Sequence, residues 1–143
     1  MTYNHTQIGH LMIFALLSVM LIFGINLIKI NFDLFFIALM LLIIFLVASF
    51  VSLQVKIDKK YLRIKFGYGI FRKRFALSDI ASAKAVRNSW YFGWGIRIWF
   101  WPKMQIYNVS GFDAVEIKMK NGKRYRIGTD EPQKLEYAIK RSI

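Results

Sequence analysis

The sequence predicts an α+β membrane protein in which a two-helix transmembrane hairpin precedes a β-barrel or sandwich of about seven strands that ends in a C-terminal helix. Two observations lead to this expectation. All but one of the 21 Lys and Arg residues follow Leu53, and the segment before it carries only Lys29 and Asp33 as charged side chains. Beyond Leu53 the apolar residues alternate with polar ones, which is typical of half-buried strands. We therefore expect two regions, a hairpin over residues 1–53 and a basic domain over residues 54–143.

Two long apolar stretches, about residues 8–28 and 34–53, predict the hairpin. Each has about the twenty residues needed to cross a hydrocarbon core of roughly 30 Å. Residues 1–7 contain no Lys or Arg, which argues against a cleaved signal peptide. The link between the stretches is short, so the helices should be antiparallel, with both chain ends on one side of the membrane. Basic residues follow the second stretch closely, whereas the link holds one lysine, and this bias places both ends in the cytoplasm.

Alternation of apolar and polar residues predicts the strands of the basic domain, at about residues 53–57, 61–66, 71–77, 80–87, 105–108, 114–120 and 123–128. The pair Asn121 and Gly122 favours a two-residue hairpin, because both residue types tolerate positive φ. Residues 130–132, Asp-Glu-Pro, are typical of a helix start. Leu135, Ala138 and Ile139 then recur at helical spacing, so the chain is expected to end in an amphipathic helix.

Three stretches carry a resemblance to a known family: Tyr-Phe-Gly-Trp-Gly-Ile-Arg at 91–97, Tyr-Asn-Val-Ser-Gly at 107–111 and Arg-Ile-Gly-Thr-Asp-Glu-Pro at 126–132. They resemble small bacterial membrane proteins in which two transmembrane helices precede a pleckstrin-homology-like (PH-like) domain. The resemblance covers essentially the whole chain. It implies a PH-like fold and a multi-pass location in the bacterial cytoplasmic (inner) membrane. The family has no agreed reaction, so the resemblance implies no catalytic residue.

An aromatic segment, residues 90–101, contains all four tryptophans of the chain. Such rings favour the membrane interface, where the ring is buried while its polar edge stays hydrated. We expect this segment to be a loop that docks on the membrane; the alternative is that it supplies strand and core residues. A segment that mixes aromatic and basic residues can also bind single-stranded nucleic acid. The membrane tether argues against this partner. The expected interface residues are Trp90, Tyr91, Phe92, Trp94, Trp99, Phe100 and Trp101, with Arg97 and Lys103 as partners for lipid phosphates.

The first predicted strand pair carries a group of basic residues expected to contact anionic headgroups: Lys56, Lys59, Lys60, Arg63 and Lys65. A signal for membrane topology is an equally good interpretation of the same charges. Many PH domains that bind phosphoinositides have a basic-x-Arg pair here, but this chain has Lys65 at the final position, so we expect generic anionic-lipid contact. The basic residues at 72–74 and 123–126 are interpreted as solvated strand faces.

No catalytic constellation stands out. The two histidines, His5 and His10, lie far in sequence from Ser110, which argues against a serine triad. The chain has no cysteine, which excludes disulfides and thiolate metal sites. The acidic residues show no metal-ligand spacing. We therefore expect no catalytic residues, no cofactor and no metal.

These observations favour a membrane-anchored binding or scaffold module that engages an unidentified membrane or cytoplasmic protein partner and anionic lipid headgroups. An exposed edge strand, or the groove between the sheet and the C-terminal helix, is the expected docking surface for a protein. Two alternatives stay open: a lipid-acting enzyme or transport accessory subunit, and a purely structural subunit of a membrane complex. Small residues in the hairpin weakly indicate a homo-oligomer.

Overall fold

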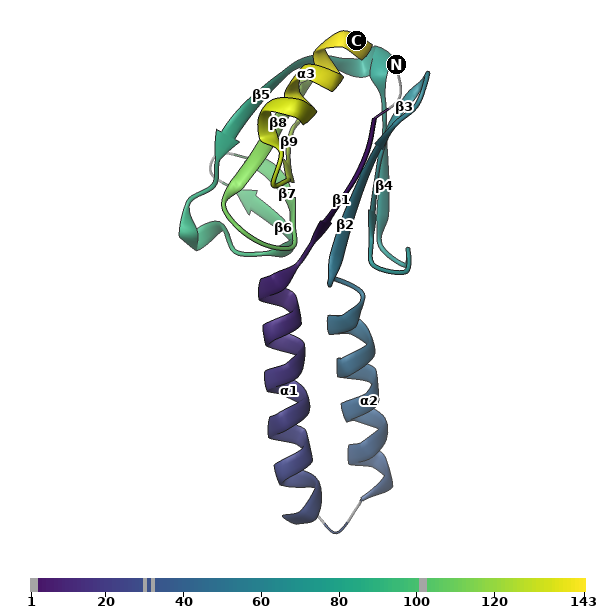
Figure 1. The fold of residues 1–143 in the computed structure, drawn as a ribbon, viewed down its shortest axis with the longest axis vertical. Coiled ribbons are helices and arrows are strands. Elements are labelled where there is room, and N and C mark those ends of the chain that lie inside the picture. Colours follow the sequence, from purple (N-terminus) through teal and green to yellow (C-terminus); the bar gives the residue numbers. More distant parts are fainter. Residues whose placement is uncertain (1–2, 30, 32, 101–102) are drawn as a thin grey trace.

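The computed structural model describes residues 3–29, 31, 33–100 and 103–143. Over these residues the chain is an α+β protein with two β-sheets and three α-helices. Figure 1 shows an elongated molecule in which helices α1 and α2 project side by side from one end of the β part. Helix α3 and both chain termini lie at the opposite end.

Helices α1 (His10–Lys29) and α2 (Leu34–Ala48) form an antiparallel pair joined by a short turn. Asp33 caps α2, since its Oδ1 accepts a hydrogen bond of 2.9 Å from the backbone N–H of Phe36. No residue of α1 is buried. Within the described part of the chain, α1 alone is long and apolar enough to cross a membrane, whereas α2, which is also apolar, has 15 residues.

The second helix ends at Ala48, although the apolar run predicted that it continues to about residue 53. Ser49 turns the chain: its hydroxyl donates to the Leu46 carbonyl at 2.5 Å. The backbone then pairs with the N-terminal segment, starting with a bond of 2.7 Å from Gly9 N to Val51 O. Pairing with a distant segment therefore overrides the helical tendency of these apolar residues.

The first sheet has the order β1-β2-β3-β4, all antiparallel. Its strands are β1 (Tyr3–Ile8), β2 (Ser52–Ile57), β3 (Tyr61–Phe66) and β4 (Arg72–Ala76). Strand β1 was not expected from the sequence. It pairs with β2 from Tyr3 opposite Ile57 to Ile8 opposite Ser52. The helical pair is thus inserted between two neighbouring strands of one sheet, which ties both helices to the β part.

The second sheet has the order β5-β8-β9-β7-β6, in which only the β7–β9 pair is parallel. Its strands are β5 (Ile80–Arg87), β6 (Gly95–Phe100), β7 (Lys103–Asn108), β8 (Asp113–Met119) and β9 (Arg124–Gly128), with 3₁₀ turns η1 (Leu77–Asp79) and η2 (Trp90–Phe92) between β4 and β6. The described residues hold nine strands, against about seven predicted. The two additional strands are β1 and β6, and β6 lies in the aromatic segment that was expected to be a loop.

Helix α3 (Pro132–Ser142) closes one end of the β part. Its apolar face is the predicted one, and Leu135, Ala138 and Ile139 are buried. They join a core of inward-facing residues from both sheets, among them Leu53, Val55, Ile57, Leu62, Ile64, Phe66, Phe75, Val115, Ile117 and Ile127. Because these inward positions alternate with outward ones, the polar residues of β2, β3 and β4 share the opposite face of the first sheet.

Candidate functional site: a cationic sheet face

The outward face of β2, β3 and β4 carries two cross-strand rows of polar residues. In the row farther from the helices, Arg63 lies between Lys56 and Arg74. In the nearer row, Lys65 lies between Gln54 and Arg72. We call the five basic residues of these rows (Lys56, Arg63, Lys65, Arg72 and Arg74) the cationic face.

Like charges directly opposite each other on neighbouring strands destabilise a sheet. Little in the cationic face offsets this repulsion. Asp58 pairs with Arg63, at 3.1 Å between Oδ2 and Nε. The backbone N–H groups of Lys60 and Tyr61 bind the Asp58 carboxylate, and together with Arg63 they lower its pKa. The face therefore keeps a positive excess.

Aromatic contact orients two of these cations. The guanidinium groups of Arg74 and Arg63 lie 4.8 and 5.5 Å from the ring centroid of Tyr61. Such contacts hold a cation without neutralising it. The basic side chains surround a groove of about 420 Å³, whose lining also includes Gln54, Ile64 and Lys73. A groove lined by several cationic donors suits phosphate oxygens, which form charge-assisted hydrogen bonds with them.

The structure separates the predicted headgroup contacts into two groups. Lys56, Arg63 and Lys65 lie together on the cationic face. Lys59 and Lys60 lie in the β2–β3 turn, at the end of the sheet far from α1 and α2, where they line a hollow with the C-terminal Ile143. Five basic residues that are close in sequence therefore belong to two separate surfaces.

Two members of the cationic face were missed as site residues, because Arg72 and Arg74 were interpreted as a solvated strand face. The pairing of the hairpin between β3 and β4 would have indicated that these residues share a surface. Its register places Arg74 opposite Arg63 and Arg72 opposite Lys65. Basic residues at alternate positions of two adjacent strands therefore indicated one shared surface.

The aromatic segment is divided between surface and core. Trp90 and Tyr91 are exposed, Trp90 to 77%. Phe92 is only 8% exposed and packs with Met104 and Ile106 in a second apolar cluster, against which Trp99 also packs. Phe92 was predicted to lie at the membrane interface, but its side chain is buried. This packing anchors the aromatic segment to the second sheet.

Trp94 and Arg97 each donate a side-chain hydrogen bond to a backbone carbonyl. Trp94 Nε1 donates to the Gly111 carbonyl at 3.0 Å, and Arg97 Nε donates to the Trp94 carbonyl at 3.3 Å. Of the remaining predicted interface residues, Trp101 lies outside the described residues, as do the side chains of Phe100 and Lys103.

Strand β6 lies beside the start of α1. A Cβ at Gly95, its first residue, would be 3.7 Å from Met12 Cε. Ile96 and Ile98 project from the same face of the strand, and both are exposed. The exposed apolar surface of β6 is therefore close to the level where the helices begin.

Arg126 is another departure from the sequence-based interpretation. Residues 123–126 were expected to form a solvated face, but the Arg126 side chain is only 16% exposed. Its Nη1 donates to Asn88 Oδ1 at 3.2 Å, and its guanidinium lies 5.4 Å from the Phe92 ring. Arg126 thus holds the aromatic segment on the second sheet and does not offer a free charge.

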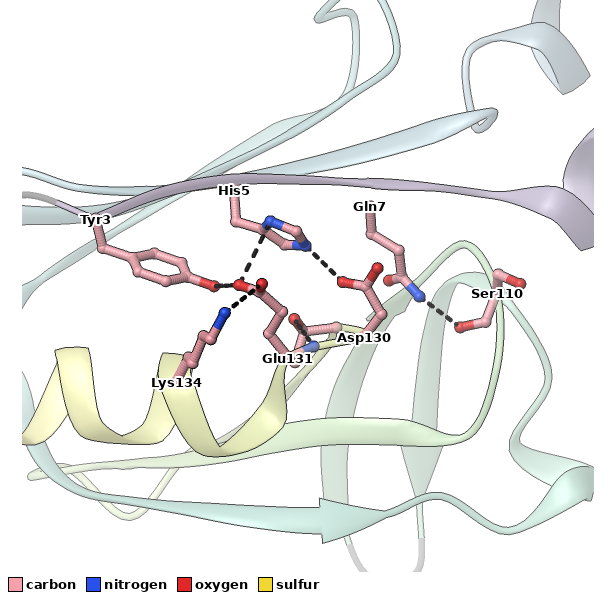
Figure 2. A network of polar contacts seen from close by, with 8 residues as sticks. Tyr3, His5, Gln7, Ser110, Asp130, Glu131 and Lys134 are labelled. Atoms are coloured by element: carbon pink, nitrogen blue, oxygen red, sulfur yellow. Dashed lines mark hydrogen bonds and ion pairs between the residues drawn. The ribbon is translucent and has the colours of Figure 1, made fainter.

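A polar latch fixes β1 to the C-terminal half of the chain (Figure 2). His5 Nε2 lies 2.5 Å from Asp130 Oδ1, and His5 Nδ1 lies 3.5 Å from Glu131 Oε2. The Tyr3 hydroxyl donates to Glu131 Oε2 at 3.3 Å. Gln7 Nε2 donates to the Ser110 carbonyl at 3.2 Å. Because β1 leads directly into α1, these contacts couple the first helix to the β part.

The ionisation of the latch follows from its contacts. A hydrogen bond of 3.0 Å from Lys134 Nζ, together with the charge of His5, lowers the pKa of Glu131. Burial and the neighbouring Glu131 raise the pKa of Tyr3, so its hydroxyl stays a donor. The hydroxyl of Tyr3 and the carboxylate of Glu131 thus hold β1 against the start of α3. Across the described part of the chain, no group of three or more His, Cys, Asp or Glu residues is arranged to hold a metal ion.

Comparison of the chain with protein-family models, curated proteins and solved structures finds no match. The function of the chain is therefore inferred from the geometry of the molecule.

Proposed function

We propose that this chain is a membrane-anchored, PH-like binding module of the bacterial cytoplasmic membrane. Helices α1 and α2 cross the bilayer as a hairpin, and the β part lies on the cytoplasmic side. There the cationic face binds the phosphates of anionic headgroups. The observation that carries the proposal is α1, a 20-residue apolar helix with none of its residues buried in the protein. A helix that is apolar all round and has no residue buried in the protein is most stable in lipid.

The lengths of the helices support a hairpin that enters from one side. Twenty residues of α1 span about 30 Å, which matches the hydrocarbon core. The 15 residues of α2 span about 22 Å. Hydrogen bonds from Phe50 N to Val47 O and from Val51 N to Ala48 O add a further turn. Local thinning of the bilayer accommodates the remaining difference at modest cost.

The height of the cationic face supports contact with headgroups. Gly9 and Val51, joined by a backbone hydrogen bond, mark the base of the helical pair. Gln54 begins the nearer row two residues after Ser52, which is roughly 7 Å along the strand. The headgroup layer extends about 5–8 Å beyond the hydrocarbon core. Lys65 and Arg72, in the same row as Gln54, therefore lie near the phosphates.

The β part supports the PH-like assignment in its general plan. A four-stranded antiparallel sheet packs on a second sheet, and one C-terminal helix closes one end of the core. The hairpin, inserted between β1 and β2, lies at the other end. A protein partner, also expected from the sequence, stays a prediction.

Single-cysteine labelling tests the topology directly, because the chain has no cysteine of its own. In inside-out membrane vesicles, an impermeant maleimide should label Asn121→Cys, in the β8–β9 turn, without permeabilisation. Asn31→Cys, in the turn between α1 and α2, should react only after permeabilisation. Equal labelling of both sites from one side, or release of the full chain by alkaline carbonate, would contradict a spanning hairpin.

Headgroup binding is tested with the full chain in nanodiscs. A fluorophore on Thr6→Cys, beside Gln54 on the outward face, should be quenched by headgroup-labelled phosphatidylglycerol more than by labelled phosphatidylcholine. Lys65→Gln with Arg72→Gln, both in the row nearer the membrane, should weaken this preference by about 2 kcal/mol, or roughly thirtyfold. At about 1 M salt, where the Debye length is about 3 Å, the preference should disappear. Unchanged quenching in the double variant would exclude the cationic face as the binding surface.

A further inference from the structure

A second hollow opens at the side of the β part, between the edge strand β4 and the second sheet. It holds about 220 Å³. Its apolar lining includes Phe66, Phe71 and Tyr107, and the exposed residues Ile70 and Ile96 form its walls. Arg72 and Lys73 lie at its rim and also line the groove of the cationic face. We call this hollow the lateral groove; it joins apolar surface to cationic surface.

The lateral groove opens beside the helices. The β3–β4 turn that carries Ile70 contacts α2, because the Tyr68 hydroxyl donates to the Phe45 carbonyl and the two rings lie 5.2 Å apart. Phe71 stacks on Phe50, just beyond the end of α2. In the proposed orientation, apolar surface is thus continuous from the lipid-facing helix into the groove, and the cations lie on its cytoplasmic side.

The charges of the groove select an anion. Lys73 and Arg72 are exposed, and Lys73 Nζ lies 6.0 Å from the Tyr125 ring centroid. Burial raises the pKa of Tyr107 to about 12, so the phenol adds no negative charge. Pockets that enclose a drug-sized ligand measure about 300–1,000 Å³. A groove of this size therefore holds a part of a larger amphipathic molecule.

We propose that the lateral groove binds one anionic phospholipid, with its glycerol and upper acyl carbons against Ile70 and Ile96 and its phosphate between Arg72 and Lys73. This inference rests on the proposed membrane location and goes beyond it. Generic attraction to anionic lipid involves many exchanging headgroups. The groove instead retains a single lipid at a defined position.

Native mass spectrometry of the full chain tests the proposal. The protein is reconstituted into vesicles of phosphatidylglycerol and phosphatidylcholine and then extracted in a mild detergent. The wild type should retain one phosphatidylglycerol. Ile96→Glu and Ile70→Glu place a carboxylate against the glycerol and upper acyl carbons of an anionic lipid and should reduce retention about tenfold, equivalent to roughly 1.4 kcal/mol. Ile98→Glu is the matched control, because Ile98 projects from the same strand face but does not line the groove.

Retention that is equal in the wild type and all three variants would overturn the proposal, as would equal retention of phosphatidylcholine. If the inserted wild type retains no lipid while the labelling result is as expected, the groove proposal fails and the membrane module stands. If the wild type does not insert, both fail. If Ile70→Glu and Ile96→Glu lose the phosphatidylglycerol while Ile98→Glu retains it, the result supports a single lipid in the groove.

Discussion

Replacing Lys65 with Gln should stabilise the β part while weakening headgroup binding. Lys65 lies directly opposite Arg72, and among the described residues its side chain makes no hydrogen bond or ion pair. The substitution therefore removes one like-charge cross-strand pair, which is worth about 0.2–1 kcal/mol. For a domain of this size, the gain corresponds to a rise in Tm of roughly 1–6 °C. Affinity for anionic bilayers should fall by about 1 kcal/mol, or fivefold.

Lys84→Gln is the matched control, since it makes the same change where the cross-strand neighbour is Glu116. Loss of this opposite-charge pair should lower Tm by a similar amount and leave headgroup binding unchanged. The assay is thermal unfolding followed by circular dichroism in nanodiscs at low salt, with binding measured by the quenching described above. A shift of Tm in the same direction for both variants, or unchanged binding by Lys65→Gln, would refute the electrostatic reasoning.

Two further predictions concern the stability of the folded chain, and Tm is the measurement for both. Gly128→Ala should destabilise the chain by about 1–3 kcal/mol, because its Cβ would lie 2.1 Å from Oδ1 of the buried Asn108; an unchanged Tm would show that Asn108 moves freely. Glu131→Gln should lower Tm at pH 7, and the difference from the wild type should shrink as the pH falls below the ordinary range of a Glu carboxyl. The lowered pKa of Glu131 gives stability that is present above its unfolded pKa, about 4.3, and is lost as pH falls through the folded value. A difference that does not shrink on acidification would indicate that the latch does not depend on the carboxylate charge.

The local sequence predicts those elements whose apolar pattern is set by their own residues. The apolar face of α3 and the alternation of β2 and β3 follow from periodicity, and the two apolar helices follow from long apolar stretches. The charge boundary at Leu53 is also a property of the sequence alone. In each case the pattern repeats within a few residues, so no distant contact is needed to recognise it.

The tertiary structure decides the features that depend on pairing between distant segments. Strand β1 forms because Tyr3–Ile8 pairs with β2 across the whole helical hairpin, and the same pairing ends α2 at Ala48. The cationic face brings Arg72 and Arg74 beside Lys65 and Arg63, while the turn sends Lys59 and Lys60 to the far end.

The aromatic segment shows the same division between sequence and structure. Its composition predicts affinity for an interface, but only packing on Met104 and Ile106 determines that Phe92 is buried while Trp90 is exposed. The sequence by itself therefore determined that a basic β domain follows an apolar hairpin. Only the folded chain decided which charges and rings share a surface, because strand register and sheet packing place residues by contacts that lie far apart along the chain.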